Sequence, residues 1–397
     1  MGKTILEMAE GCRGEVVEFL REIIGIASPV GEEGAVVARI KSEMEALGYD
    51  EVFVDPLGNL LGRIGSGSRV LAIDGHCDTV GVGNPALWSV DPFKGDMREG
   101  VIYGRGAADQ KGGVAAAVYA GKILREIGLP DDVTVWVVVS VLEEGYEGFN
   151  WEYIIGEDRI VPDAVVLTEP TNLQISVGHK GRADIKIRVE GESSHGSRPD
   201  MGVNAIYKMM PIVRAIEELH PMLGKSELLG KASIAVTDIR SSSPNLNAVP
   251  DSAEIFVDRR LTEGETVEDA LEQLRNLPAM VEARGVVEVA EFEVKSYTGL
   301  TSKAKSSYPS WCMEADHSLV AAAGEAYQEM FGEKARLRTW DFSTNGVATR
   351  GKYNIPTIGF GPGDDKYAHT VDDQVPVDHV IQAMAFYVGL VRRFVRE

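Results

Sequence analysis

The chain has 397 residues, a formal net charge of −21 at pH 7, and 44% hydrophobic and 25% charged residues. A globular chain of this length usually forms more than one domain, and this composition supplies enough apolar residues for its cores. The negative charge argues against nucleic acid and against a membrane as partners, because both bind basic patches. It does not exclude an anionic substrate, since a few arginines or metal ions can reverse the charge inside a cleft.

Three cysteines lie far apart in the chain, at Cys12, Cys77 and Cys312, and no CxxC pair occurs. This pattern predicts neither a disulfide framework nor a thiolate zinc site, and it fits a reducing compartment. The first residues lack the apolar stretch of a signal peptide, and no run is long enough to span a bilayer. We therefore expect a cytoplasmic protein.

Apolar periodicity and short apolar runs predict an α/β domain at the start of the chain. The predicted helices cover residues 12–26, 31–48 and 112–127, and the predicted strands cover residues 51–54, 59–64, 70–73, 133–142 and 164–167. The last two strands are almost wholly apolar, which is typical of strands covered on both faces. Charged residues follow them directly, and open α/β sheets place their sites at the carboxyl ends of strands.

The pattern changes near residue 180, where residues 182–190 alternate between apolar and polar side chains. Further elements then follow: a helix over 202–220, strands over 232–239 and 252–261, a helix over 265–284 and a strand over 286–295. This β-α-β-β-α-β order is that of the ferredoxin-like sandwich. After it, the chain returns to a helix over 316–331, a strand over 357–359 and a helix over 378–395. The sequence thus predicts a catalytic domain of residues 1–180 and 298–397, with residues 181–297 inserted as a second domain.

Candidate metal ligands occur in several of the segments that end these strands or form turns. A neutral His76 can bind zinc, while Asp78 can accept its second ring N–H and fix the tautomer. Asp109 lies in a glycine-rich segment just before a helix, where it could bridge two cations. Glu143 and Glu144 end a buried strand, and adjacent carboxylates are costly there unless a metal or a proton neutralises them. Two more residues complete the candidate set: Glu169 and His369.

Each candidate also has an ordinary structural explanation. A His-x-Asp sequence often arises by chance, paired glutamates often lie in solvated loops, Glu169 could cap a helix, and His369 could be a surface residue. Together the candidates favour a metal site, because most of them follow turn signals or buried strands in one domain. Histidines and carboxylates without thiolates suit a catalytic pair of zinc ions.

Along nearly the whole chain lie seven ordered segments: GHCDTV, GRGAADQKGG, LEEGYEG, TEP, SSHGSRPDMGVNAI, NAVPDSAEIFVDRR and GPGDDKYAHTVDD. They resemble the metallopeptidase and amidohydrolase family of aminoacylase, acetylornithine deacetylase, succinyl-diaminopimelate desuccinylase and carboxypeptidase G. The resemblance implies a zinc-exopeptidase-type α/β/α catalytic domain with an inserted ferredoxin-like α+β dimerisation domain, and hence a homodimer.

The resemblance also implies a metal centre of two divalent ions per subunit. Asp109 would bridge them, with His76 and Glu169 completing the protein ligands of one ion and Glu144 and His369 those of the other. Zinc is the expected ion, with cobalt and manganese as alternatives. Glu169 stands where some relatives have aspartate, so the choice between aminopeptidase-like and deacylase-like activity stays open.

For catalysis and binding the resemblance implies further roles. Glu143 would be the general base and Asp78 would orient His76. His195 would reach the partner's active site and stabilise the oxyanion, although an inert loop histidine is the alternative. The same motifs imply three substrate contacts. Arg260 would bind a carboxylate of the substrate, with Arg259 as the competing candidate for this role. Asn247 would be a polar contact in the same cleft, and Gly363 would offer its backbone N–H.

One segment departs from the family pattern. Many relatives carry Gly-Gly-Thr/Ser-Asp-Ala before the last strand, whereas this chain has Trp340-Asp-Phe-Ser-Thr-Asn-Gly346. It resembles a branch that includes hydrolases linked by name to selenium metabolism, so no relative's substrate transfers directly. The expected function is hydrolysis of the amide C–N bond of an N-acyl amino acid or short peptide with a free carboxylate. The alternatives are a dipeptidase or aminopeptidase of the same fold, and a non-catalytic binding protein.

Overall fold

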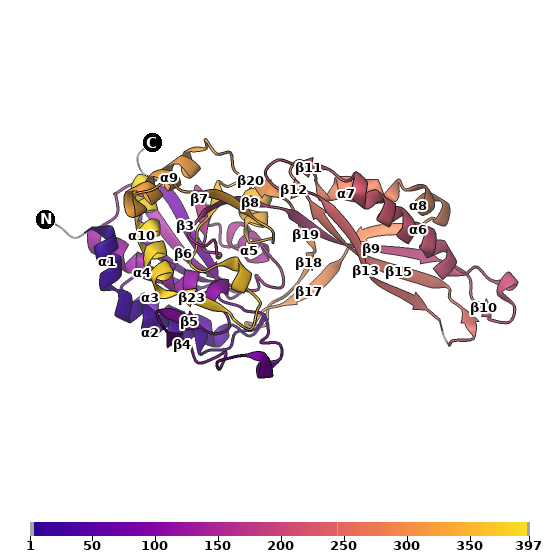
Figure 1. The fold of residues 1–397 in the computed structure, drawn as a ribbon, viewed down its shortest axis with the longest axis horizontal. Coiled ribbons are helices and arrows are strands. Elements are labelled where there is room, and N and C mark those ends of the chain that lie inside the picture. The colour runs from indigo at the N-terminus through magenta and orange to yellow at the C-terminus, as the bar shows by residue number, and fades with distance from the viewer. Residues whose placement is uncertain (1–3, 244, 395–397) are drawn as a thin grey trace.

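The computed structural model describes residues 4–243 and 245–394. A large lobe carries both ends of the described chain, and a narrower lobe built from the middle of the chain extends from it (Figure 1). Buried apolar side chains form two separate cores, one that collects residues from Ile5 to Val391 and one confined to residues between Ala183 and Val287. The predicted arrangement, an α/β domain with a second domain inserted, is therefore confirmed.

The large lobe contains a nine-stranded sheet with the order β1-β2-β6-β3-β7-β22-β8-β20, and β21 pairs with β8. The strands are β1 (Glu51–Val54), β2 (Leu60–Gly65), β3 (Arg69–His76), β6 (Val133–Ser140), β7 (Ala164–Leu167), β8 (Ile175–His179), β20 (Trp311–Cys312), β21 (Leu337–Trp340) and β22 (Thr357–Gly359). β3 runs parallel to both β6 and β7, and all the residues of β6 are buried. The apolar, β-branched sequence of β6 thus forms a strand covered on both faces.

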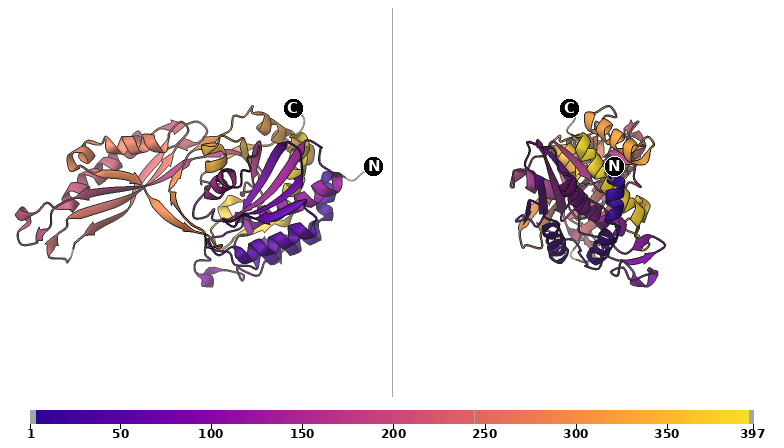
Figure 2. Two further views of the ribbon diagram at one scale, coloured as in Figure 1. Left: turned by 180° about the vertical axis from the view of Figure 1, so that it is seen from behind. Right: turned by 90° about the vertical axis from the view of Figure 1, so that its left-hand side faces the viewer.

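Helices pack around this sheet, as the two views of Figure 2 show. They are α1 (Ile5–Gly11), α2 (Arg13–Ile24), α3 (Gly34–Ala46), α4 (Gly112–Ile127), α5 (Phe149–Gly156), α9 (Ser318–Phe331) and α10 (Val377–Arg393). Small residues let α4 approach its neighbours closely. A Cβ atom added at Gly121 would lie 1.9 Å from the Tyr49 hydroxyl, and one at Gly113 would lie 2.5 Å from the Thr168 carbonyl oxygen. Among the described residues, no helix has the length and apolar character needed to cross a membrane.

The inserted domain has the predicted β-α-β-β-α-β order, with the sheet order β13-β15-β9-β16. Its elements are β9 (Gly181–Glu190), α6 (Ala205–Leu219), β13 (Ser233–Ser242), β15 (Ser252–Leu261), α7 (Val267–Arg275), α8 (Pro278–Ala283) and β16 (Val286–Val289). The helix predicted over 265–284 is divided between α7 and α8, because Pro278 lacks a backbone N–H and Leu277 before it is extended. In β15, buried and partly exposed residues alternate, so one face packs against the helices.

The strand predicted over 286–295 is also divided. β16 ends at Val289, and residues 291–295 form β17 (Glu291–Lys295), which pairs with β18 (Thr301–Lys305) as a hairpin between the lobes (Figure 2). The hairpin contacts the large lobe through Tyr297, whose hydroxyl donates to the Gly58 carbonyl at 3.1 Å, and Thr298, which donates to the Pro56 carbonyl at 2.7 Å. The domain boundaries after residues 180 and 297 stay predictions.

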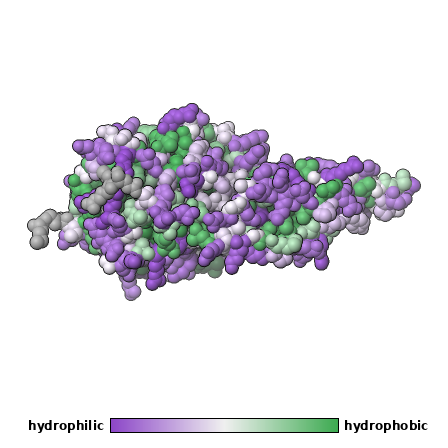
Figure 3. Space-filling view, turned by 90° about the horizontal axis from the view of Figure 1, so that it is seen from above, coloured by the Kyte–Doolittle hydropathy of each residue, from purple (hydrophilic) through white to green (hydrophobic). Residues whose placement is uncertain are grey.

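Short strands complete the structure. They are β4 (Asp96–Arg98), β5 (Val101–Tyr103) and β23 (Gln374–Pro376) in one sheet, β10 (Ser194–His195) with β14 (Ala248–Val249), β11 (Lys225–Ser226) with β12 (Gly230–Lys231), and β19 (Ser307–Tyr308), which pairs with β9. Hydrophilic residues cover much of the face drawn in Figure 3, and hydrophobic residues gather between them in small patches on both lobes.

Candidate metal centre

The carboxyl ends of three neighbouring strands bring the first candidate ligands together. His76 is the last residue of β3, Glu143 and Glu144 follow β6, and Glu169 follows β7. Because β3 is parallel to both neighbours, with His76 opposite Ser140, these strand ends meet at one edge of the sheet. The sheet topology thus places residues far apart in the sequence around one point.

Asp109 reaches this point from the turn before α4, and a second aspartate shapes that turn. The carboxylate of Asp373 accepts hydrogen bonds from the backbone N–H groups of Gly106 at 2.7 Å and Ala108 at 2.8 Å, and from Arg105 at 3.0 Å. Gly106 has a φ of +86°, a left-handed conformation that favours glycine. Asp373 was not among the residues predicted from the sequence, although it lies in the last of the seven segments.

The two oxygen atoms of Asp109 face different histidines. Oδ1 lies 3.0 Å from Nε2 of His76, and Oδ2 lies 3.2 Å from Nε2 of His369. His369 also lies 2.9 Å from Oε2 of Glu144, and it comes from the loop between the short helix Asp365–Tyr367 and β23. The predicted ligands from the two ends of the chain are therefore in contact, with Asp109 between them.

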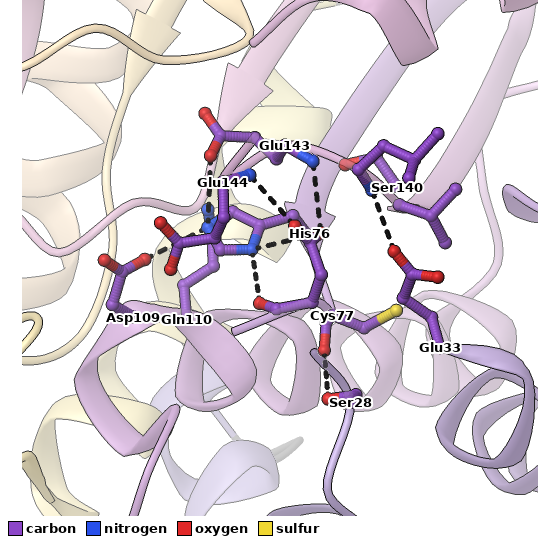
Figure 4. A network of polar contacts seen from close by, with 12 residues as sticks. Ser28, Glu33, His76, Cys77, Asp109, Gln110, Ser140, Glu143 and Glu144 are labelled. Carbon is purple, nitrogen blue, oxygen red and sulfur yellow. Dashed lines mark hydrogen bonds and ion pairs between the residues drawn. The ribbon is translucent and has the colours of Figure 1, made fainter. Parts of the chain in front are cut away.

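Glu143 and Glu169 approach the same ring nitrogen of His76 as Asp109 does. This nitrogen, Nε2, is 3.7 Å from Oε2 of Glu143 and 3.7 Å from Oε1 of Glu169. Ligand atoms of His76, Glu143 and Glu169 lie within 4.8 Å of one another, and so do those of His76, Asp109 and Glu144. In Figure 4 the carboxylates of Asp109, Glu143 and Glu144 gather on one side of the His76 imidazole.

The chemistry of this donor set fits divalent cations. Within the described residues, Oε1 of Glu143 and Oε1 of Glu144 are buried and have no hydrogen-bond partner. Burial and the charges of nearby carboxylates raise the pKa values of Glu143, Glu144 and Glu169 above their usual range. Although burial opposes it, the charge of Glu143 and a hydrogen bond with Asp109 hold the pKa of His76 well above its usual value. Bound cations would neutralise this cluster of acids and supply partners for its free oxygens.

The ring of His76 is oriented by the main chain of Asp78. Nδ1 of His76 lies 2.9 Å from the carbonyl oxygen of Asp78 and 3.6 Å from its carboxylate oxygen Oδ1. The carboxylate instead accepts the backbone N–H groups of Glu143 at 3.2 Å and Glu144 at 2.9 Å. Asp78 thus contacts His76 through its carbonyl oxygen and the turn after β6 through its carboxylate.

His195 and Asn247 lie together, away from this centre. His195 belongs to β10 at the end of the inserted domain that points away from the large lobe (Figure 1). It is opposite Ala248 in β14, next to Asn247, and both predicted residues are exposed. Nδ1 of His195 accepts the backbone N–H of Ser197 at 3.1 Å. Within one chain, the structure does not bring either residue to the metal ligands.

The remaining predicted contacts lie on different elements. Arg260 is partly exposed on β15 and forms a bidentate ion pair with Asp258, with Nε 2.8 Å from Oδ1 and Nη2 2.9 Å from Oδ2. Its competitor Arg259 is buried and binds Glu265 at 2.9 Å, which is a structural contact within the inserted domain. Gly363 is buried with a φ of +84°, and a Cβ atom there would lie 3.4 Å from Ala108, beside the Asp109 turn.

The unusual segment 340–346 supports the strands that carry the ligands. Asn345 donates to Asp74 in β3 at 2.9 Å and to Ser140 in β6 at 3.1 Å. Ser343 donates to Glu147 at 2.9 Å, and the carboxylate of Glu147 also accepts Arg182 at 3.0 Å. None of these supporting residues was predicted, because a single sequence does not reveal which polar side chains meet in a core.

The fold and this cluster define a metallohydrolase, and comparisons with known proteins agree. Residues 72–393 match the model of peptidase family M20/M25/M40, so the chain belongs to this family, as the sequence motifs predicted. It is a metal-dependent hydrolase that acts on C–N bonds.

Several relatives are similar over their full lengths. The Escherichia coli protein YgeY is 44% identical over 388 residues, which cover 98% of this chain and 96% of that protein. The succinyl-diaminopimelate desuccinylase of Paracoccus denitrificans is 27% identical over 394 residues, 95% of this chain and 97% of the enzyme. A solved structure of a dinuclear metal-binding M20 peptidase from Bacillus subtilis superposes with a TM-score of 0.71 at 14% identity, covering 96% of this chain and 98% of the other.

Proposed function

We propose that this protein hydrolyses the amide bond of an N-acyl amino acid or a short peptide that has a free carboxylate, using two divalent ions. The observation that carries this proposal is the position of Asp109, whose two oxygens each face a different histidine. The similarity to a desuccinylase supports an N-acyl substrate. A dipeptidase or aminopeptidase is the second candidate, because a peptidase is among the proteins with this fold.

In the proposed centre Asp109 would serve both ions, with His76 and Glu169 as the other protein ligands of one ion and Glu144 and His369 as those of the second. When bound, the ions supply polarisation of the substrate carbonyl and a lowered pKa of the attacking water. We expect zinc, with cobalt and manganese as alternatives. The nitrogen and carboxylate donors of this set are those that a catalytic zinc pair prefers.

Glu143 is proposed as the general base. It takes a proton from the attacking water and returns the proton to the leaving amine. One feature supports this role: its Oε1 is buried without a hydrogen-bond partner among the described residues, so it is free to accept a proton. Its neighbour Glu144 instead lies 2.9 Å from His369, in keeping with a ligand role.

We further propose that residues of the inserted domain complete the substrate-binding site. Arg260 would bind the substrate carboxylate by exchanging its Asp258 partner for the substrate. His195 and Asn247 would reach the site of a partner subunit, since they are exposed at the end of the inserted domain. Exposed apolar side chains on this domain support a homodimer interface: Met201, Tyr207, Met210, Met222 and Ile239. Gly363, beside the Asp109 turn, would offer its backbone N–H to the substrate.

A substrate screen combined with Glu143→Gln tests the proposal. We expect turnover of N-acetyl, N-succinyl or N-carbamoyl amino acids above that of dipeptides, and the reverse order would favour the peptidase alternative. Glu143→Gln cannot accept a proton, so turnover should fall by roughly 10²–10⁴-fold while bound metal persists. Near-normal turnover of Glu143→Gln would refute its role as base. Loss of metal in this variant would instead mean that Glu143 and Glu144 exchange roles.

A further inference from the structure

The turn that carries Glu143 and Glu144 has a main-chain conformation that needs support. Leu142, the residue before Glu143, has a φ of +65° although it is not glycine. A left-handed conformation of this kind persists only where its surroundings hold it, and such positions cluster at functional sites. The contacts that hold Leu142 therefore also affect where the next side chain, that of Glu143, points, whereas the N–H of Glu144 is held separately by Asp78 at 2.9 Å.

Side-chain acceptors bind four consecutive backbone N–H groups of this turn. Val141 donates to Oδ1 of Asn59 at 3.2 Å, Leu142 to Oε1 of Glu33 at 3.3 Å, Glu143 to Oδ1 of Asp78 at 3.2 Å, and Glu144 to Oδ2 of Asp78 at 2.9 Å. The three acceptors come from separate parts of the sequence, before β2, before α3 and after β3. Buried N–H groups need such partners, and here the partners fix the turn.

Glu33 is the least expected of these acceptors. Its side chain has no exposed surface, and its Oε1 also accepts the backbone N–H of Gly31 at 2.9 Å. Within the described residues its Oε2 has no hydrogen-bond partner. Figure 4 shows the Glu33 carboxylate pointing at the main chain that follows Ser140, separated by Cys77 from His76. Burying a carboxyl group with one oxygen that lacks a partner among the described residues is costly.

We propose that Glu33 is a positioning residue, which holds the N–H of Leu142 and thereby aims Glu143 at the reacting water. It acts through the main chain, because its carboxylate accepts the backbone N–H groups of Gly31 and Leu142 and, within the described residues, forms no hydrogen bond or ion pair with a proposed metal ligand. This inference rests on the proposed role of Glu143 as base. If Glu33 only stabilised the fold, its replacement would lower stability or metal binding in general. As a positioning residue, its replacement should slow only the proton transfer that Glu143 performs.

Steady-state kinetics of two Glu33 variants give the first test. Glu33→Ala removes the acceptor, so kcat should fall roughly 10- to 100-fold, with KM and the metal content of the protein unchanged. Glu33→Gln keeps an oxygen acceptor for both N–H groups and should restore kcat to within about threefold of the wild type. Glu32→Ala is the matched control, because Glu32 is exposed beside it and should change neither constant. A fall in metal content that explains the lost activity, or an equal loss in Glu33→Gln, would overturn the proposal.

A double-mutant cycle tests whether Glu33 acts through Glu143. In the background of Glu143→Gln, Glu33→Ala should lower the residual rate by less than about twofold, because the group it positions is already inactive. A full 10- to 100-fold further loss would show that Glu33 acts on something else. If Glu33→Ala fails to fold, Glu33→Asp provides the same test, since its carboxylate is one methylene too short to reach Leu142.

Hydrogen–deuterium exchange keeps the proposal testable apart from catalysis. Amides of residues 141–144 should exchange faster in Glu33→Ala than in the wild type and in Glu32→Ala, because the Leu142 N–H loses its acceptor. Unchanged exchange would overturn the proposal whatever the substrate is. If exchange is faster but the protein hydrolyses no amide, the positioning of Leu142 by Glu33 is supported and only the proposed function is refuted.

Discussion

Asp78→Asn separates two roles for Asp78 that the sequence alone could not distinguish. Its carboxylate accepts the N–H groups of Glu143 and Glu144, while its carbonyl oxygen faces the ring of His76. The substitution leaves the carbonyl oxygen in place, so His76 keeps its orientation. It replaces one carboxylate oxygen by an amide N–H₂ group, which cannot accept either backbone N–H.

The magnitude follows from these contacts. One hydrogen bond to a charged acceptor contributes about 1.5–3 kcal/mol, and a buried N–H left without an acceptor costs about 1–3 kcal/mol. We therefore expect a loss of about 2–4 kcal/mol, divided between the free energy of unfolding and the activation free energy of hydrolysis. If all of it falls on the activation barrier, kcat drops by roughly 30- to 1,000-fold, since about 1.4 kcal/mol corresponds to a factor of ten.

The assay measures kcat, KM and bound metal in Asp78→Asn, with Asp163→Asn as the control. Asp163 also accepts a backbone N–H, that of Val70 at 2.7 Å, but at the opposite end of β3 and in an exposed position. We expect Asp78→Asn to lower kcat with metal binding retained, and Asp163→Asn to change neither. If Asp78→Asn loses metal while turnover per bound ion stays normal, the carboxylate acts on His76 and this reasoning is wrong.

Three further predictions concern residues outside the metal cluster. His179 is buried and neutral, since its Nε2 accepts the N–H of Thr344 at 3.1 Å and burial lowers its pKa to about 4. At His179 unfolding therefore binds a proton below about pH 6.5, so the contribution of this residue to the free energy of unfolding should fall by about 1.4 kcal/mol per pH unit from about pH 6.5 toward 4. A pH slope in His179→Gln that equals the wild-type slope would contradict this. Arg260→Lys should slow hydrolysis of free acids far more than of the matching amides, because lysine cannot form the two-pronged pair; equal penalties would refute the carboxylate role. Mixing His195→Ala with Glu143→Ala subunits should restore activity, because one site of the mixed dimer is then whole; confirmed subunit exchange without recovery would rule out a site shared between subunits.

Much of the fold could be predicted because its strands and helices have strong local signals. The apolar, β-branched run of β6 and the alternating pattern of β9 gave the correct elements in the correct order. The elements that were wrong depend on one residue or on distant contacts. Pro278 divides one predicted helix, and β17 leaves its predicted strand because it pairs with β18.

The candidate ligands could be predicted because metal chemistry restricts them to a few residue types that follow strands or turns. The residues that hold these ligands in place could not be predicted. Glu33, Asn59, Asp373 and Asn345 are common polar residues without a spacing rule, and each acts on main chain or side chains far away in the sequence. Their roles arise from the folded topology, which a single sequence does not display.

Metal content of Asp109→Ala, measured beside the wild type by elemental analysis, tests the central claim most directly. Asp109 lies between His76 and His369, at 3.0 and 3.2 Å. The wild type should bind about two divalent ions per chain and lose activity on chelation, with recovery on adding zinc, cobalt or manganese. Asp109→Ala should lose both ions together, because one carboxylate serves both. A variant that keeps one ion at full occupancy would contradict the bridging role, and a fully active metal-free wild type would contradict the dinuclear centre itself.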